Sequence, residues 1–117
     1  MADETTTLES LRAKVAAFVR ARDWEQFHRP ANIAKAISVE AAELLELFQW
    51  REVEDLDARM RARVEEELAD VVIYCLSAAN TMDIDLSDAV LRKLRRNKER
   101  YPADKWRGRA RDASREE

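Results

Sequence analysis

Two pairs of acidic residues constrain the fold of this chain more than any other feature of its sequence. Glu40 and Glu43 are three residues apart, and so are Glu67 and Asp70. On a helix this spacing places both carboxylates of a pair on one face. Two such helices packed face to face would gather four negative charges, which repel one another and resist burial. A hard divalent cation would neutralise them, and oxygen ligands favour Mg²⁺, Mn²⁺ or Ca²⁺.

The composition predicts an all-α fold. Only one glycine and two prolines occur in 117 residues, so little in the sequence interrupts a helix. This length suits a single domain with a modest core. The formal net charge of −3 demands neither nucleic acid nor a membrane as a partner. Acidic residues dominate from Ser38 to Asp70 and basic residues from Arg92 to Glu117, so we expect an acidic centre and a basic final helix.

Apolar residues at helical spacing predict four helices. The first is expected to begin at a Thr6–Glu9 capping box, and the second to span residues 31–51. The third is expected to run from Asp55 or Asp57 to Asn80, and the fourth from an Asp85 cap to Tyr101-Pro102. Together they predict one helical domain over residues 1–102. The Arg-rich residues 103–117 contain few apolar side chains and predict a charged, flexible tail.

The remaining sequence signals favour the cytoplasm. The single Cys75 cannot form a disulfide within the chain, which fits a reducing compartment. The N-terminus shows no signal-peptide pattern, and the longest apolar segment is too short to span a bilayer. We therefore expect a cytoplasmic protein that makes no membrane contact.

Each acidic pair continues into an aromatic residue on its own face. Trp50 lies seven residues after Glu43, and Tyr74 lies four residues after Asp70. A single acidic pair on a helix is most often a solvated face. Two matched pairs with apolar and aromatic neighbours favour a metal site beside a flat ligand with a charged end, such as a nucleotide.

The last predicted helix carries Lys93, Asn97 and Arg100 on one stripe. A basic helix is usually a solvated face or a nucleic-acid surface, but opposite an acidic metal site it could hold phosphates. Other metal chemistries lack their ligands. His28 is the only histidine and lies between two predicted helices, whereas a di-iron bundle needs a Glu-x-x-His motif on each of two helices. A single glycine cannot build a phosphate-binding loop.

An ordered set of motifs closely resembles the MazG-like all-α nucleoside triphosphate pyrophosphohydrolases. The motifs are residues 22–28 (RDWEQFH) with Pro30 and Asn32, residues 40–50 (EAAELLELFQW), residues 66–74 (EELADVVIY), and Lys93, Asn97, Arg100, Tyr101 and Pro102. Within the family, the resemblance is to the dCTP pyrophosphatase branch.

The resemblance implies Mg²⁺-dependent hydrolysis of a nucleoside triphosphate to the monophosphate and pyrophosphate, on dCTP or modified dCTP, as house-cleaning of the nucleotide pool. Glu40, Glu43, Glu67 and Asp70 match the family's metal ligands and are the candidate catalytic residues, with Mn²⁺ as a possible substitute ion. The candidate substrate-binding residues are Trp24, Glu25, Gln26, Phe27, His28, Trp50 and Tyr74 for the nucleoside, and Lys93, Asn97 and Arg100 for the phosphates. The resemblance also implies a four-helix bundle assembled through dimers into a tetramer, with pockets at subunit contacts.

Two alternatives stay open. Val15 stands where animal relatives tend to carry a histidine of the nucleotide pocket, so a broad-specificity (d)NTP pyrophosphatase is the first. The second is a non-enzymatic helical module that binds nucleic acid or another partner through residues 92–111. The acidic centre makes this second alternative the weaker one, and we do not expect nucleic acid as a partner.

Overall fold

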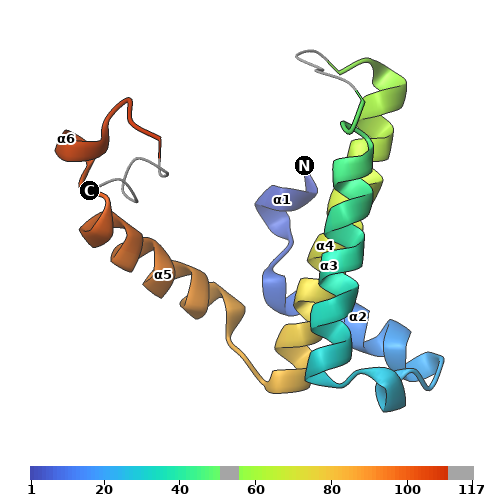
Figure 1. The fold of residues 1–117 in the computed structure, drawn as a ribbon. Helices are drawn as coiled ribbons and strands as arrows, with labels where there is room; N and C mark the ends of the chain where they lie inside the picture. The colour runs from blue at the N-terminus through green and yellow to red at the C-terminus, as the bar shows by residue number, and fades with distance from the viewer. Residues whose placement is uncertain (51–55, 111–117) are drawn as a thin grey trace. The chain divides into compact units, whose positions relative to one another are not determined.

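The structure is a computed structural model of the chain, and it describes residues 1–50 and 56–110. These residues form helices and no strand, which confirms the all-α prediction. In chain order the elements are α1 (Ala2–Thr5), α2 (Leu8–Ala21), the 3₁₀ turn η1 (Glu25–Phe27), α3 (Pro30–Glu46), α4 (Ala58–Met82), α5 (Leu86–Arg100) and α6 (Ala103–Trp106) (Figure 1). The chain divides into two compact units, Met1–Ile84 and Asp85–Glu117.

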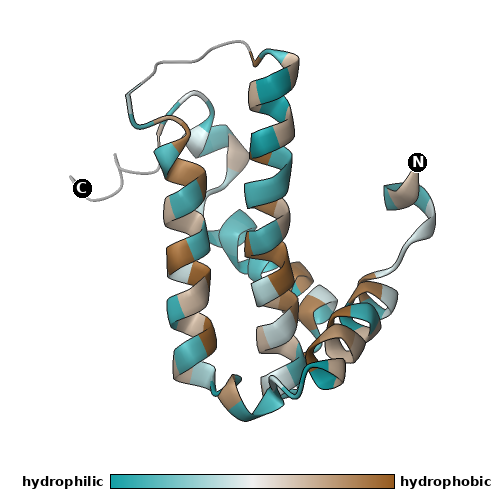
Figure 2. Ribbon diagram, turned by 90° about the vertical axis from the view of Figure 1, so that its right-hand side faces the viewer, coloured by the Kyte–Doolittle hydropathy of each residue, from teal (hydrophilic) through white to brown (hydrophobic). Residues whose placement is uncertain are grey.

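The first unit is built around an antiparallel pair of long helices. α3 packs along α4, and α2 packs against α4 as well (Figure 1). Ile33 of α3 and Leu76 of α4 are each only 2% exposed and belong to the core of this unit. Val19 of α2 is buried as well. Hydrophobic residues occur along the whole length of α3 and α4 (Figure 2). The pair therefore brings the two acidic stripes onto facing helices.

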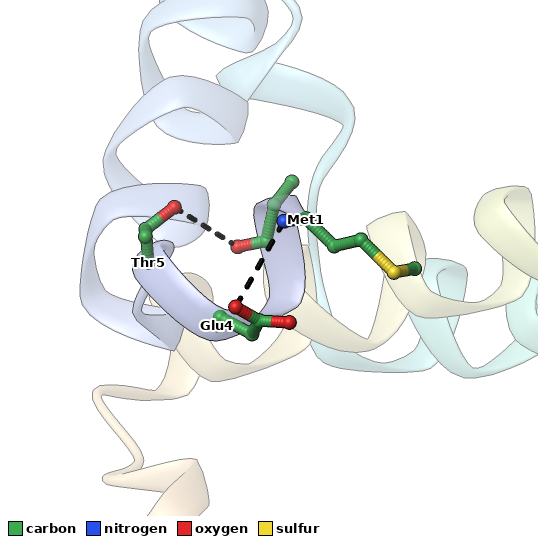
Figure 3. Close-up of polar contacts among 4 residues, drawn as sticks. Met1, Glu4 and Thr5 are labelled. Carbon is green, nitrogen blue, oxygen red and sulfur yellow. Dashed lines mark hydrogen bonds and ion pairs between the residues drawn. The ribbon is translucent and has the colours of Figure 1, made fainter.

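The start of the first long helix differs by one residue from the prediction. Thr7, not Thr6, is the N-cap of α2, and its side chain accepts a hydrogen bond from the Ser10 backbone N–H at 3.1 Å. The short helix α1 precedes it, and Thr6 is its C-cap. In α1 the Thr5 hydroxyl donates to the Ala2 carbonyl oxygen at 3.5 Å (Figure 3). Either threonine can cap a helix, so the extra turn of helix decides which one does.

α3 begins one residue earlier and ends five residues sooner than predicted. Pro30 occupies its first turn, where the missing N–H costs no intrahelical bond. Beyond Glu46 the backbone tightens, because the N–H groups of Leu47, Phe48 and Gln49 bond to carbonyls three residues earlier at 2.9–3.3 Å. Trp50 thus lies in a turn after the helix, and the predicted end at residue 51 lies outside the described residues.

α4 begins after Asp57, whose carboxylate accepts a hydrogen bond from the Met60 N–H at 2.8 Å. The alternative cap, residue 55, lies outside the described residues. The helix ends two residues later than predicted, at Met82, where Asp83 turns the backbone into the left-handed region with φ of 52°. At 25 residues, α4 is the longest described helix, and both α3 and α2 pack against it.

The second unit contains α5 and α6. Asp85 caps α5 by accepting from the Asp88 N–H at 3.0 Å, as predicted, and the helix ends before Tyr101-Pro102. α6 lies within the segment predicted to be a tail, and the Trp106 ring meets the Tyr101 ring edge to face at 5.0 Å between centroids. Residues 111–117 of that segment lie outside the described residues, and the domain boundary at residue 102 stays a prediction. No helix in the described ranges is long and apolar enough to cross a membrane.

Candidate functional site

The structure brings together the four acidic residues that the sequence singled out. One carboxylate oxygen from each of Glu40, Glu43, Glu67 and Asp70 lies within 4.8 Å of the others. The first two come from α3 and the last two from α4, so the antiparallel helix pair forms the site from two facing stripes. We call these four residues the carboxylate cluster.

The cluster is electrostatically uncompensated. Glu40 and Glu67 each have a buried Oε2 atom without a hydrogen-bond partner among the described residues. Burial raises the pKa of both glutamates, and the nearby Glu43 and Asp70 carboxylates raise it further. None of the ion pairs formed within residues 1–50 and 56–110 includes a cluster residue. Buried carboxylate oxygens without a partner need a cation or a proton.

The donor set fits a hard divalent cation. All four ligands are carboxylates, and their oxygens lie close enough to share an ion. Mg²⁺ and Mn²⁺ prefer such oxygen ligands, whereas zinc sites in proteins usually include histidine or cysteine. Glu40, Glu43, Glu67 and Asp70 are therefore the residues that would hold the metal.

A cavity of about 380 Å³ adjoins the cluster, and we call it the Trp50 pocket. It is lined by Glu43, Glu46, Leu47, Trp50, Met60, Arg63 and Glu67. Glu43 and Glu67 belong to both the pocket and the cluster, so the two are continuous. Leu47 and Met60 are buried, whereas the Trp50 side chain is 87% exposed. The volume lies within the range of small-molecule sites, about 300–1,000 Å³.

The segment between α2 and α3 carries Trp24 and Phe27, and we call it the aromatic loop. It is held by its own contacts. Asp23 adopts a positive φ of 54°, and the next N–H, that of Trp24, donates to the Val19 carbonyl oxygen at 3.1 Å. The Trp24 ring meets the edge of Phe18 at 5.8 Å, and the Arg22 guanidinium lies 3.6 Å from the Phe18 ring centroid. These contacts orient Trp24 at the end of α2.

The polar residues of the loop motif have local roles. Gln26 donates to the carbonyl oxygen of Asp23 at 3.0 Å and to its carboxylate at 3.2 Å. Asn32 donates to the Phe27 carbonyl oxygen at 3.1 Å. Phe27 itself is 59% exposed. These bonds fix the backbone between α2 and α3 and leave the Phe27 ring accessible.

Two loop residues line a second cavity of about 290 Å³, which we call the His28 pocket. Its lining residues are Ala16, Val19, Arg20, Glu25, His28, Ser77, Asn80 and Thr81. Ser77 lies ten residues after Glu67 on α4, which is about 15 Å along the helix axis. Within one chain, therefore, Glu25 and His28 do not line the cavity that Trp50 lines. Tyr74 lies between the two cavities in sequence and lines neither of them.

Lys93, Asn97 and Arg100 belong to α5 in the second unit. Their spacing of four and three residues keeps them on one stripe of that helix. The Arg100 guanidinium lies 5.4 Å from the Tyr101 ring centroid. Their assignment to phosphate binding stays a prediction.

Sequence reasoning missed two charged residues of the Trp50 pocket. Glu46 lies three residues after Glu43, and Arg63 lies four residues before Glu67, so each continues an acidic stripe. The same spacing rule that identified Trp50 and Tyr74 could have identified them. Their importance depends on the packing of α3 against α4, which places both residues in one cavity.

Comparison with known proteins agrees with these features. Over 109 residues the chain is 44% identical to dCTP pyrophosphatase 1 of Bos taurus, a match that covers 89% of this chain and 64% of that protein. The human protein of the same name is 45% identical over 102 residues, which cover 83% of this chain and 60% of the human one. The chain thus spans less than two thirds of the length of these curated relatives.

A solved structure shows the same fold. The crystal structure of a pyrophosphatase from Archaeoglobus fulgidus superimposes with a TM-score of 0.73 and 40% identity, covering 80% of this chain and 91% of that one. The MazG-like family matches residues 35–114, which include the whole carboxylate cluster. By sequence, fold and acidic helix pair, this chain belongs to the MazG-like family.

Proposed function

We propose that this chain is a divalent-metal-dependent nucleoside triphosphate pyrophosphohydrolase that converts dCTP, or a modified dCTP, to the monophosphate and pyrophosphate. The observation that carries the proposal is the continuity of the carboxylate cluster with the Trp50 pocket. A cation on the cluster suits the triphosphate, and the pocket beside it suits a base. The names of the relatives support the same reaction and the same base.

The carboxylates account for the chemistry of this reaction. Water adds to the α-phosphorus, the bond from that phosphorus to the oxygen bridging to the β-phosphorus breaks, and pyrophosphate leaves. When bound, Mg²⁺ would offset the charge of the triphosphate and polarise the α-phosphoryl group. The cluster would hold the ion, and one of its carboxylates would orient the attacking water and accept its proton.

The apolar surface of the first unit supports assembly through dimers. Side chains of α3 and α4 that face away from the core remain substantially exposed, namely Val39 at 56%, Leu45 at 67%, Leu68 at 51%, Val72 at 42% and Ile73 at 42%. In one chain the His28 pocket and the Trp50 pocket are separate. A second copy packed on this face would cover the apolar residues and could add its aromatic loop to the site. We extend this proposal to a tetramer made of two dimers, located in the cytoplasm.

A substrate panel with resolved products tests the proposal. The protein is incubated with each dNTP and NTP in the presence of Mg²⁺, and the products are separated. We expect dCTP to yield dCMP and pyrophosphate in a reaction that EDTA stops. Release of orthophosphate, or no turnover of any nucleotide, would contradict the proposal, and equal turnover of all bases would favour the broad-specificity alternative.

Matched variants test the assignment of the cluster. Glu43→Gln and Asp70→Asn keep the size of the side chain but remove its charge, and each is expected to lower kcat/KM by about 100-fold or more. Glu65→Gln is the control, because Glu65 lies on α4 but pairs with Arg61 at 3.5 Å and belongs to neither the cluster nor the Trp50 pocket. Activity that survives both cluster substitutions would show that the cluster is not the catalytic site.

A further inference from the structure

The Trp50 pocket contains two charged side chains with no role in the proposal so far. Arg63 and Glu46 both line it, and within the described part of the chain neither side chain forms an ion pair. By contrast, Arg61 on the same helix as Arg63 forms an ion pair with Glu65. Arg63 and Glu46 are therefore available to a ligand in the pocket.

The rest of the pocket suits a flat ring. The apolar side chains of Leu47 and Met60 are only 9% and 6% exposed, so they form a fixed apolar lining. The Trp50 indole is largely exposed and offers a face on which a base can stack. Glu43 and Glu67 connect the pocket to the cluster. A base in the pocket would thus leave its phosphates near the metal ligands.

The two charged side chains offer opposite hydrogen-bonding groups. A guanidinium only donates hydrogen bonds, and an ionised carboxylate only accepts them. The ring edge that satisfies both must present acceptors to Arg63 and a donor to Glu46. Cytosine does so, because its 4-amino group donates beside the acceptors N3 and O2. Uracil and thymine carry a carbonyl oxygen at position 4. This oxygen would face the Glu46 carboxylate, and no hydrogen bond could form because both groups only accept.

We propose that Arg63 and Glu46 read the base edge and select a 4-aminopyrimidine. Arg63 donates to N3 and O2 of cytosine, and Glu46 accepts from the 4-amino group. This inference rests on the proposed function, since it assigns the base specificity of the same site. Neither residue takes part in the bond cleavage itself.

The ratio of kcat/KM for dCTP to that for dUTP tests the inference. Glu46→Gln replaces an acceptor by a group that can also donate to the carbonyl oxygen of uracil. We expect the ratio to fall by about tenfold or more, because a site built for one hydrogen-bonding pattern discriminates against the other. Arg63→Ala is expected to lower kcat/KM more for dCTP than for dUTP. Since both substrates are measured on the same sample, the ratio does not depend on the fraction of folded protein.

Arg61→Ala and Glu65→Gln are the matched controls. They break an exposed ion pair on α4 outside the pocket, so the ratio should stay at the wild-type value. If Glu46→Gln and Arg63→Ala also leave the ratio unchanged, or lower both activities equally, the inference is wrong while the proposed function stands. A wild-type preference for dUTP would likewise overturn it. No turnover of any triphosphate by the wild-type protein would overturn both.

Discussion

Arg12 and Asn80 join α2 to the end of α4 through reciprocal hydrogen bonds. Arg12 Nε donates to Asn80 Oδ1 at 3.0 Å, and Asn80 Nδ2 donates to the Arg12 carbonyl oxygen at 3.0 Å. Arg12 also donates to the carbonyl oxygens of Ile84 at 2.7 Å and Ala79 at 3.0 Å. A cation thus satisfies carbonyl groups at the negative end of the longest described helix.

We predict that Arg12→Met destabilises the protein by about 2 kcal/mol, because hydrogen bonds to a charged group contribute about 1.5–3 kcal/mol. Urea unfolding followed by circular dichroism measures the change. Arg61→Met is the control, since Arg61 forms only an exposed ion pair with Glu65, and such pairs contribute about 0–1 kcal/mol. Equal stability of the two variants would show that the Arg12 bonds contribute little.

Protons and Mg²⁺ are predicted to compete for the carboxylate cluster. The pKa values of Glu40 and Glu67 are raised above the ordinary value of a glutamate, first by burial and then by neighbouring carboxylates. The native state therefore binds more protons than the unfolded state just above that value, so the metal-free protein loses stability as pH rises through the raised pKa values. Bound Mg²⁺ would offset the repulsion among the ionised carboxylates at high pH. At low pH the glutamates are protonated, so Mg²⁺ would stabilise the protein less.

Thermal unfolding with EDTA or with Mg²⁺ measures this competition. We expect the Mg²⁺-induced rise in Tm to be largest near about pH 8 and to shrink toward about pH 5 as the glutamates take up protons. Glu40→Gln should raise the Tm of the metal-free protein and diminish the effect of Mg²⁺. A Mg²⁺ effect that grows on acidification would contradict the assignment of the cluster as the metal site.

Trp50 is predicted to affect binding without affecting stability. Its side chain is 87% exposed, so Trp50→Ala removes little buried apolar surface and should leave the Tm almost unchanged. The loss of a stacking face should raise KM for the nucleotide by about tenfold, and Trp50→Phe should retain most of the affinity. Steady-state kinetics with dCTP would show this pattern. An unchanged KM in Trp50→Ala would exclude stacking on this ring.

The exposed apolar face of α4 is predicted to lie in a subunit contact. Leu68 is 51% exposed in the single chain, so Leu68→Glu should be tolerated by a monomer but should disrupt a contact that buries it. Sedimentation velocity is expected to show an oligomer for the wild type and smaller species for Leu68→Glu. Arg59→Glu, which also places a new carboxylate on the exposed surface of α4, is the control. A monomeric wild-type protein would contradict the prediction.

Local sequence patterns determined the four long helices and the candidate metal ligands, but not the short helices α1 and α6. Spacings of three and four residues identified Glu40, Glu43, Glu67 and Asp70, and capping chemistry identified Asp57 and Asp85. These features depend on residues within one helical turn of each other, so they can be predicted from the sequence alone. The errors occurred where two local signals compete, as at Thr6 and Thr7, or where the backbone tightens, as after Glu46.

The tertiary structure decided which stripes meet. Only the antiparallel packing of α3 on α4 brings Arg63 and Glu46, which lie on different helices, into the cavity that Trp50 lines. The same packing separates Glu25 and His28 from that cavity within one chain. Helical periodicity assigns each side chain to a face, but the direction and register of two packed helices depend on how residues far apart in the sequence, such as the buried Ile33 and Leu76, pack in the core.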